Sequence, residues 1–154
     1  MERIIYISTA PAPMEPEEIA ALLAISRRNN AAAGITGLLI YHDASFLQVL
    51  EGEDPALSAC LDRIARDPRH RWLIVLWRGA VAERAFPEWQ MGYARLSDLC
   101  ADTAGAGGPA VLSLHDLVDR GLGAGADPMV EQLVASFLGG FRDLGHGGMA
   151  LRLP

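Results

Sequence analysis

The segment Ser45-Phe46-Leu47-Gln48-Val49-Leu50-Glu51-Gly52 decides how the fold of this chain is predicted. Apolar residues dominate the segment, as in a buried β-strand, yet an amide side chain stands in its middle. Because side chains alternate between the two faces of a strand, Gln48 shares one face with Phe46 and Leu50. A buried amide is costly unless its hydrogen bonds are satisfied, so the sequence predicts a bonding partner for Gln48.

The segments around this strand predict an α+β domain with the element order βαββαββ. Apolar runs, alternation and helical spacing indicate strands at residues 4–8, 35–41, 45–51, 72–77 and 91–96, and helices at residues 16–30 and 54–67. The second helix begins with Asp54-Pro55, a capping carboxylate followed by proline. A hairpin is expected around His42-Asp43-Ala44, although this turn lacks the usual glycine.

The size and composition of the chain suit one compact domain with an extension. It has 154 residues, of which 51% are hydrophobic and 21% charged. Beyond Leu96 glycine and alanine become frequent, and residues 104–109 are typical of a flexible connection. We therefore expect residues 1–97 to form the domain and residues 98–154 to form a linker and a helical extension that serves output or oligomerisation.

Two helices are expected in this extension. Ser113 and Asp116 resemble a capping box ahead of an apolar run. Asp127-Pro128 begins a second segment, whose apolar stripe runs through residues 130–144. Such a stripe must be covered, either by the second face of the sheet or by another subunit.

Charge and hydropathy exclude several classes of protein. The net charge of −6 argues against general nucleic-acid binding, which needs a basic field. No apolar run reaches the length of a membrane span and no signal peptide is present, so a cytoplasmic location is expected. The two cysteines fit no metal-ligand spacing. One cluster runs against the acidic average and suits a small anion: Arg63, Arg66, Arg69, His70 and Arg71.

Polar residues from three predicted elements converge if two of the strands share a sheet face. The strand at 4–8 places Tyr6 and Ser8 on one of its faces. If this strand and the strand at 45–51 belong to the same sheet, these two residues and Gln48 lie on the same face of it. The helix at 16–30 presents Ser26 and Asn30 at the end of its apolar stripe. An apolar cleft with a few inward polar groups is the usual design of a small-molecule site.

Two further pairs complete this predicted cleft. Leu22 on one helix and Ile64 on the other are placed to clamp a flat ring, while Arg69 and His70 at the mouth are placed to hold phosphates. Taken singly, each polar residue also has a structural explanation, since buried polar groups normally find partners and charge runs are normally solvated. Asn29-Asn30, for example, is equally compatible with a helix end.

Several segments, taken in order from Arg3 to Leu96, carry a family resemblance. They are Ile5-Tyr6-Ile7-Ser8, Ser26-Arg27-Arg28-Asn29-Asn30, Gly34-Ile35-Thr36-Gly37-Leu38-Leu39, Phe46-Leu47-Gln48-Val49-Leu50-Glu51-Gly52, Asp67-Pro68-Arg69-His70, and residues 84–92 with Phe86, Trp89 and Met91. Together they resemble the BLUF family, the blue-light sensors that use FAD. Beyond Leu96 no family motif can be matched.

The resemblance implies a ferredoxin-like sheet with the flavin ring between two helices, and FAD bound non-covalently. Tyr6 resembles the tyrosine that donates an electron and then a proton to the excited flavin. Gln48 resembles the glutamine that bridges this tyrosine and the flavin, and Asn30 the asparagine that bonds the ring. The other positions implied are Ser26 and Asn29 as flanking contacts, Leu22 and Ile64 around the ring, Phe46 as pocket lining, Arg69 and His70 near the phosphates, Trp89 and Met91 as a switching pair, and Ser8 as a residue that tunes the network.

The predicted function is therefore a photoreceptor and not an enzyme, with no metal site. An amide offers both donors and an acceptor, so a rotated or tautomerised Gln48 presents different hydrogen bonds to the same flavin atoms. We expect a short, stand-alone member of the family, because the residues after 97 are too few for an effector domain of roughly 100 residues. Its C-terminal helices would relay the signal to a partner protein, and a homo-oligomer is expected.

Two alternatives stay open at this point. The first is a ferredoxin-like enzyme of the acylphosphatase type, with Arg69 and Asn30 binding a phosphorylated substrate. Against it, Pro11 and Pro13 remove backbone donors from the turn where such an enzyme would hold phosphate. The second is an adaptor that binds flavin without any photocycle.

Overall fold

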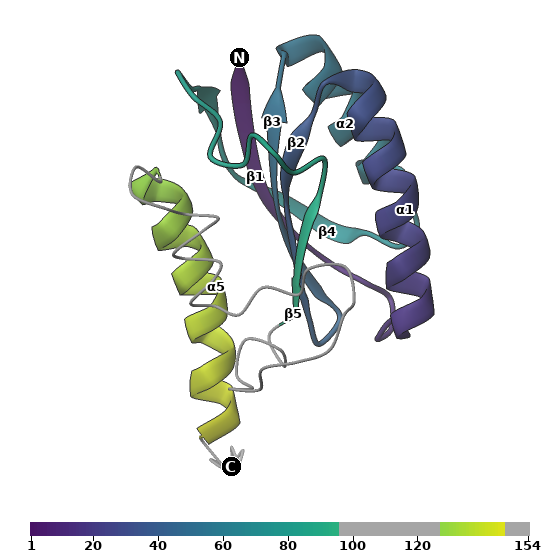
Figure 1. The fold of residues 1–154 in the computed structure, drawn as a ribbon. Coiled ribbons are helices and arrows are strands. Elements are labelled where there is room, and N and C mark those ends of the chain that lie inside the picture. The colour runs from purple at the N-terminus through teal and green to yellow at the C-terminus, as the bar shows by residue number, and fades with distance from the viewer. Residues whose placement is uncertain (96–126, 147–154) are drawn as a thin grey trace.

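The computed structural model describes residues 1–95 and 127–146 (Figure 1). Its elements are β1 (Glu2–Thr9), α1 (Pro16–Ala33), β2 (Thr36–His42), β3 (Ser45–Gly52), α2 (Asp54–Ala65), β4 (Arg71–Ala80), β5 (Gly92–Arg95) and α5 (Pro128–His146). The predicted order βαββαββ is confirmed. The expected linker at 104–109 and the capping box at Ser113 and Asp116 lie outside the described residues.

The strands form one mixed sheet in the order β4-β1-β3-β2-β5. β1 pairs antiparallel with β3 and β4, β2 pairs antiparallel with β3, and β5 joins at the edge, parallel to β2. The first four strands with α1 and α2 make the expected ferredoxin-like arrangement. In the register of β1 and β3, Tyr6 lies opposite Gln48, which brings together two polar groups that the sequence singled out.

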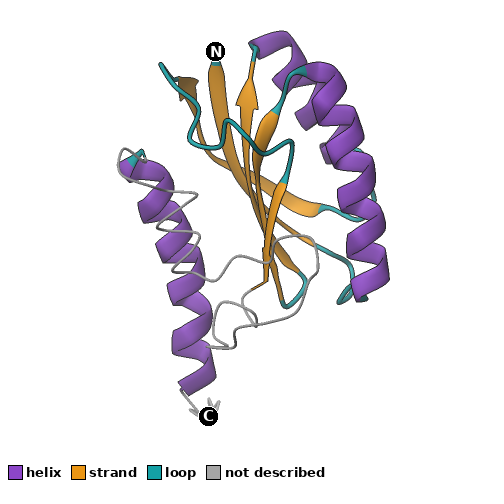
Figure 2. Cartoon of the chain, in the orientation of Figure 1, coloured by secondary structure: helices purple, strands orange, loops and turns teal. Residues whose placement is uncertain are grey.

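The sheet separates two hydrophobic cores. Figures 1 and 2 show α1 and α2 on one side of the sheet and α5 on the other. On the α5 side, Val130 and Val134 are buried against the sheet residues Ile5, Leu38 and Val49. The part of the predicted stripe with described side chains therefore covers the second face of the sheet, which is the first of the two alternatives expected for it.

Helix α1 begins as its sequence predicts and ends later. Pro16 occupies its first turn, and the Glu15 amide donates to the Glu18 carboxylate at 2.8 Å. The helix runs to Ala33, three residues beyond the predicted end, and stops at Gly34 with a φ of 66°. Asn29 and Asn30 therefore lie inside the helix, so the interpretation of this pair as a helix end is wrong.

The hairpin between β2 and β3 closes without glycine. Asp43 and Ala44 form its turn with φ of 45° and 58°, the left-handed conformation that a two-residue hairpin requires. His42 pairs with Ser45 across the turn. The absence of glycine therefore costs local conformational energy and leaves the predicted pairing of the strands unchanged.

β4 is an edge strand whose apolar side chains are largely exposed. Among the strands of residues 1–95, it pairs with β1 alone. Trp72 is 81% exposed and Ile74 is 54% exposed. The apolar density of residues 72–77 thus predicted a strand correctly, but density alone does not indicate burial, because an edge strand lacks a neighbour on one side.

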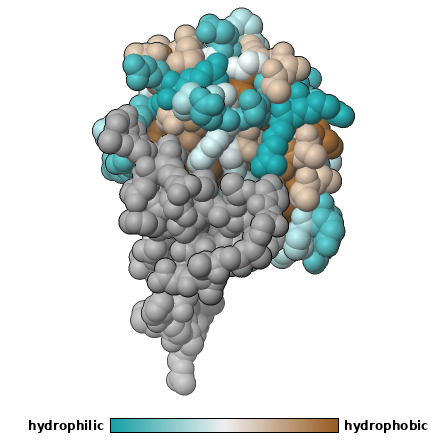
Figure 3. Space-filling model, in the orientation of Figure 1, coloured by the Kyte–Doolittle hydropathy of each residue, from teal (hydrophilic) through white to brown (hydrophobic). Residues whose placement is uncertain are grey.

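The exterior is mixed in character. On the face shown in Figure 3, polar and apolar side chains are interspersed over the part that is not grey. Among residues 1–95 and 127–146, no helix is both long enough and apolar enough to cross a membrane.

Candidate functional site

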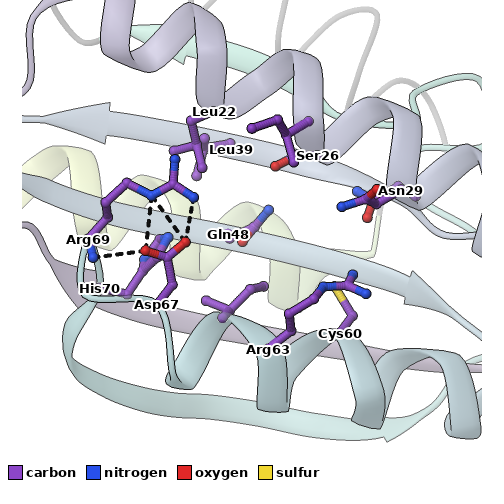
Figure 4. A pocket seen from close by; sticks show the side chains of 13 residues that line it. Leu22, Ser26, Asn29, Leu39, Gln48, Cys60, Arg63, Asp67, Arg69 and His70 are labelled. Carbon is purple, nitrogen blue, oxygen red and sulfur yellow. Dashed lines mark hydrogen bonds and ion pairs between the residues drawn. The ribbon is translucent and has the colours of Figure 1, made fainter.

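A cavity of about 180 Å³ lies between α1, α2 and the sheet. Figure 4 shows side chains of α1 on one side of it and of α2 on the other, with Gln48 between them. Eight of the residues predicted for the site line this cavity: Leu22, Ser26, Asn29, Asn30, Gln48, Ile64, Arg69 and His70. The predicted slot between two helices is therefore present.

Tyr6, Gln48 and Met91 form a buried chain of contacts at the floor of the cavity. The Tyr6 hydroxyl donates a hydrogen bond to Gln48 Oε1. Gln48 Nε2 donates in turn to Met91 Sδ at 3.3 Å, where sulfur is a weak acceptor. All three side chains are buried, and this burial raises the pKa of Tyr6 well above its ordinary value. The phenol is therefore protonated at neutral pH.

Gln48 keeps bonding capacity that this chain does not use. A primary amide offers two N–H donors and a carbonyl oxygen with two lone pairs. The contacts with Tyr6 and Met91 use one donor and one lone pair. Because Gln48 also lines the cavity, its remaining donor and acceptor are available to a bound molecule.

Met91 and Trp89 lie on opposite faces of the sheet. Met91 belongs to the core beneath α1 and α2, whereas Trp89 packs with the core beneath α5. The Trp89 ring stacks on Phe86 with a centroid distance of 5.4 Å and an interplanar angle of 17°. Both residues precede β5, which begins at Gly92, so strand alternation does not apply to them. The sequence left this placement undecided.

The segment before β5 is bonded to α1. Asn30 Nδ2 donates to the Gln90 carbonyl at 2.8 Å, and Arg27 Nε donates to the Met91 carbonyl at 3.0 Å. Arg27 was not predicted to have this role. Its spacing of three residues from Asn30 was the available signal, because residues i and i+3 share a helix face.

Ser8 and His70 contact each other beside Tyr6. Ser8 Oγ lies 2.8 Å from His70 Nδ1, and the imidazole packs on Phe46 with a centroid distance of 4.7 Å. Desolvation lowers the pKa of His70 against the opposing effect of Asp67. The imidazole is therefore mostly neutral at pH 7, and it both lines the cavity and contacts Ser8.

Arg69 is paired with Asp67 at the edge of the cavity (Figure 4). Its Nε lies 2.9 and 3.0 Å from the two carboxylate oxygens, and the hydrogen bond from Arg69 holds the pKa of Asp67 below its usual value. Arg69 also lines a second hollow, formed with residues 10–14 of the turn after β1. A ligand longer than the cavity could therefore pass Arg69 from one hollow to the other.

Sequence reasoning missed other residues of the wall. Cys60, a buried core residue, also lines the cavity, and so does Arg63, which the sequence placed only in a basic cluster; Leu39 and Asp67 line it as well. Cys60 stands four residues before Ile64, and this helical spacing could have placed it on the same face.

The lining fits a flat heteroaromatic cofactor. Leu22 and Ile64 supply apolar surface from the two helices, while Gln48, Asn30 and Ser26 supply hydrogen-bonding groups. The Tyr6 phenol, which can be oxidised, is hydrogen-bonded to the Gln48 amide that lines the cavity. The fold and the site thus define a class of small α+β domain that holds a planar cofactor next to a tyrosine.

The family model for sensors of blue light using FAD, abbreviated BLUF, matches residues 1–92. The chain belongs to this family. Its cofactor is accordingly a flavin, FAD in the family's own description.

Relatives of known name agree with this assignment. Photoactivated adenylate cyclase subunit beta of Euglena longa is 37% identical over 87 residues, which are 56% of this chain and 10% of that protein. A structure of Klebsiella pneumoniae BlrP1 with FMN and cyclic diGMP has a TM-score of 0.70 at 28% identity, covering 90% of this chain and 34% of that one. The ground state of BlsA has a TM-score of 0.58 at 26% identity, covering 75% and 82%.

The chain spans about a tenth of the length of the curated relatives that it matches. The likeness to them therefore concerns the sensor domain.

Proposed function

We propose that residues 1–97 sense blue light through FAD held non-covalently in the slot between α1 and α2. The observation that carries this proposal is the hydrogen bond from the Tyr6 hydroxyl to Gln48, a residue that also lines the slot. Through this one amide, the phenol and a cofactor in the slot are linked.

Residues of both helices would hold the flavin ring. Leu22 and Ile64 would contact its two faces, and Asn30 would hydrogen-bond its edge, with Ser26 and Asn29 as flanking contacts. Phe46, which is fully buried beneath the slot, would close its floor. In support, all of these except Phe46 line the cavity.

Arg69 and His70 would lie near the phosphate chain. The Arg69 side chain is 40% exposed and lines both hollows. Its guanidinium can therefore bind a phosphate oxygen while it stays paired with Asp67. His70 would act mainly through its contact with Ser8. Because the His70 ring also contacts Tyr6, Ser8 would tune the surroundings of Tyr6 by holding this ring.

The light reaction would proceed through Tyr6 and Gln48. When bound, the flavin absorbs blue light and accepts an electron. Tyr6 would supply that electron and then its hydroxyl proton, and the amide of Gln48 would turn over or tautomerise. Both the electron and the proton would return to Tyr6 as the radical pair recombines, and the new arrangement of Gln48 would persist. In the turned amide the carbonyl oxygen faces Met91 Sδ, which has no hydrogen to donate, so the contact between Gln48 and Met91 is lost. Trp89 and Met91 would then move as the switching pair.

The signal would leave through residues 98–154 toward a partner protein. Support comes from α5, which packs on the sheet face opposite the slot and is therefore within reach of a change in the sheet. Homo-oligomerisation and a cytoplasmic location are further parts of this proposal. The net charge of −6 supports a protein partner over a nucleic acid.

Visible spectra of the FAD-reconstituted chain, recorded in the dark and under blue light, test the proposal. We expect a flavin spectrum whose band shifts to longer wavelength in light and returns in darkness. Gln48→Leu and Tyr6→Phe should keep the bound flavin and lose the reversible shift. A colourless protein after reconstitution, or a normal shift in Gln48→Leu, would contradict the mechanism.

The acylphosphatase alternative has no support. The family model matches residues 1–92 to sensors that use FAD, and Pro11 and Pro13 remove backbone donors from the turn where such an enzyme would hold phosphate. The adaptor alternative is separated by the same spectra, because it requires bound flavin without a photocycle.

A further inference from the structure

A buried ion pair lies on the sheet face that α5 covers. Arg3 of β1 and Glu51 of β3 are partners in the strand register, and Arg3 Nε donates to Glu51 Oε1 at 2.6 Å. Arg3 is 2% exposed and Glu51 is fully buried. Glu51 follows Gln48 by three positions, so the two side chains point to opposite faces of β3. Burying such a pair is unfavourable unless further hydrogen bonds complete it.

Glu51 completes its bonds with the loop that leads to Met91. Its Oε1 accepts from the Ala85 amide at 2.9 Å, and its Oε2 accepts from the Phe86 amide at 3.0 Å. Arg84 adds a hydrogen bond from Nη1 to the Glu51 carbonyl at 2.9 Å. One end of the loop is thereby held by the ion pair.

The other end of this loop lies at the slot. Met91 accepts from Gln48, and the Met91 and Gln90 carbonyls are bonded to α1. Between these ends, Phe86 stacks on Trp89, and the Trp89 carbonyl accepts from the Gly37 amide of β2 at 2.8 Å. A short, multiply bonded segment thus joins Gln48 on one face of the sheet to Glu51 on the other.

Arg3 completes its bonds with the start of α5. Its Nη1 donates to Asp127 Oδ2. The second carboxylate oxygen of Asp127 accepts from the Met129 amide at 2.9 Å, and the Asp127 carbonyl accepts from the Glu131 amide at 3.2 Å. Asp127 therefore caps α5 with one oxygen and binds β1 with the other.

We propose that Arg3, Glu51 and Asp127 are positioning residues that carry the change at Gln48 and Met91 to the first turn of α5. This inference rests on the proposed function. When Met91 is released, the loop shifts the amides that Glu51 holds, and Glu51 stays with Arg3 because separating them would leave a buried charge unpaired. The contact that breaks is the one between Arg3 and Asp127, because the Asp127 side chain is 34% exposed and water can replace Arg3 as its partner. Light therefore loosens the first turn of α5.

Hydrogen exchange of the full chain with FAD, in darkness and under continuous blue light, tests the inference at residues 131–134. The test variant is Asp127→Asn, which keeps a capping oxygen for Met129 but places an NH₂ group where Arg3 needs an acceptor. The matched control is Glu131→Gln, which removes one negative charge from the same exposed turn without contacting Arg3. Asp127→Glu retains the carboxylate.

We expect light to speed exchange at residues 131–134 severalfold in the unaltered chain and in Glu131→Gln. In Asp127→Asn, exchange should be fast already in darkness and at least four-fifths of the light-dependent difference should disappear, while the flavin shift persists. Asp127→Glu should recover part of the difference. The inference is overturned if Asp127→Asn keeps the full difference, if Glu131→Gln loses it equally, or if the unaltered chain shows the flavin shift without any change in α5. Absence of the flavin shift would instead refute the proposed function, and the inference with it.

Discussion

Gln48 is bonded within the protein at both ends of its amide. Its oxygen accepts from Tyr6 and its nitrogen donates to Met91. The partner on β1 could be anticipated from strand alternation once the two strands were taken as neighbours. The partner Met91 could not, because it precedes β5 and its direction depends on the loop rather than on strand geometry.

Met91→Leu tests the contact at the residue scale. Leucine fills a similar volume but cannot accept a hydrogen bond. The dark arrangement of Gln48 therefore loses about 0.5 kcal/mol of stabilisation, the lower end of the range for a single hydrogen bond. The flavin shift should persist, and its decay in darkness should become about twofold slower. Time-resolved absorbance at the shifted band measures the decay. A decay rate equal to that of the unaltered chain would show that the sulfur contact does not contribute.

Among the elements, helix starts were predicted more accurately than helix ends. Pro16 and Asp54-Pro55 mark the starts of α1 and α2 as expected, because capping residues act on their own neighbours. The continuation of α1 to Ala33 was underestimated, because Asn30, of a residue type that can end a helix, is here held inside the helix by its hydrogen bond to the Gln90 carbonyl. The tendency of asparagine to end a helix is thus outweighed by this tertiary contact, and α1 continues to Ala33.

Glycines in α5 give a prediction at the element scale. Gly139 and Gly140 lie inside this helix, and a Cβ atom on either would have no atom of the described residues within 4 Å. Each change to alanine should therefore stabilise the helix by up to about 1 kcal/mol. Urea unfolding followed by circular dichroism measures the gain.

A glycine in the sheet provides the contrast. A Cβ atom on Gly37 of β2 would lie 1.9 Å from the Val49 carbonyl oxygen, so Gly37→Ala should destabilise the protein by several kcal/mol. Equal effects of the changes at Gly37 and Gly139 would contradict this explanation.

At the scale of the whole molecule, one sheet supports two different environments. Its α1 and α2 face carries the slot, and its α5 face carries an apolar core closed by the ion pair of Arg3 and Glu51. Asp127 joins α5 to this pair. The attachment of α5 therefore depends on charge as well as on the burial of Val130 and Val134.

This dependence predicts how acid affects the attachment of α5. The Met129 amide and the Arg3 guanidinium hold the pKa of Asp127 below its usual value near 3.9. A carboxyl whose pKa is lowered by folding stabilises the folded chain above its unfolded pKa, and this contribution is lost as the pH falls through the folded pKa. The difference in unfolding free energy between the unaltered chain and Asp127→Asn should thus be fully present at pH 5 and shrink as the pH falls through the lowered pKa of folded Asp127.

Urea unfolding at a series of pH values measures this difference. Because other carboxyl groups titrate over the same range, the comparison with Asp127→Asn isolates the contribution of Asp127. A difference that is the same at pH 5 and pH 2.5 would show that the charge of Asp127 does not hold α5.

The sequence by itself determined the class of the fold, the order of its elements and most of the lining of the slot. These features depend on periodicity, caps and short motifs, which act between residues near in the chain. Tertiary structure alone decided that Met91 faces Gln48 while Trp89 faces α5, and that Arg3, Glu51 and Asp127 meet. The last of these contacts joins residues 124 positions apart, and such contacts depend on packing and on the satisfaction of buried charge, which no local pattern encodes.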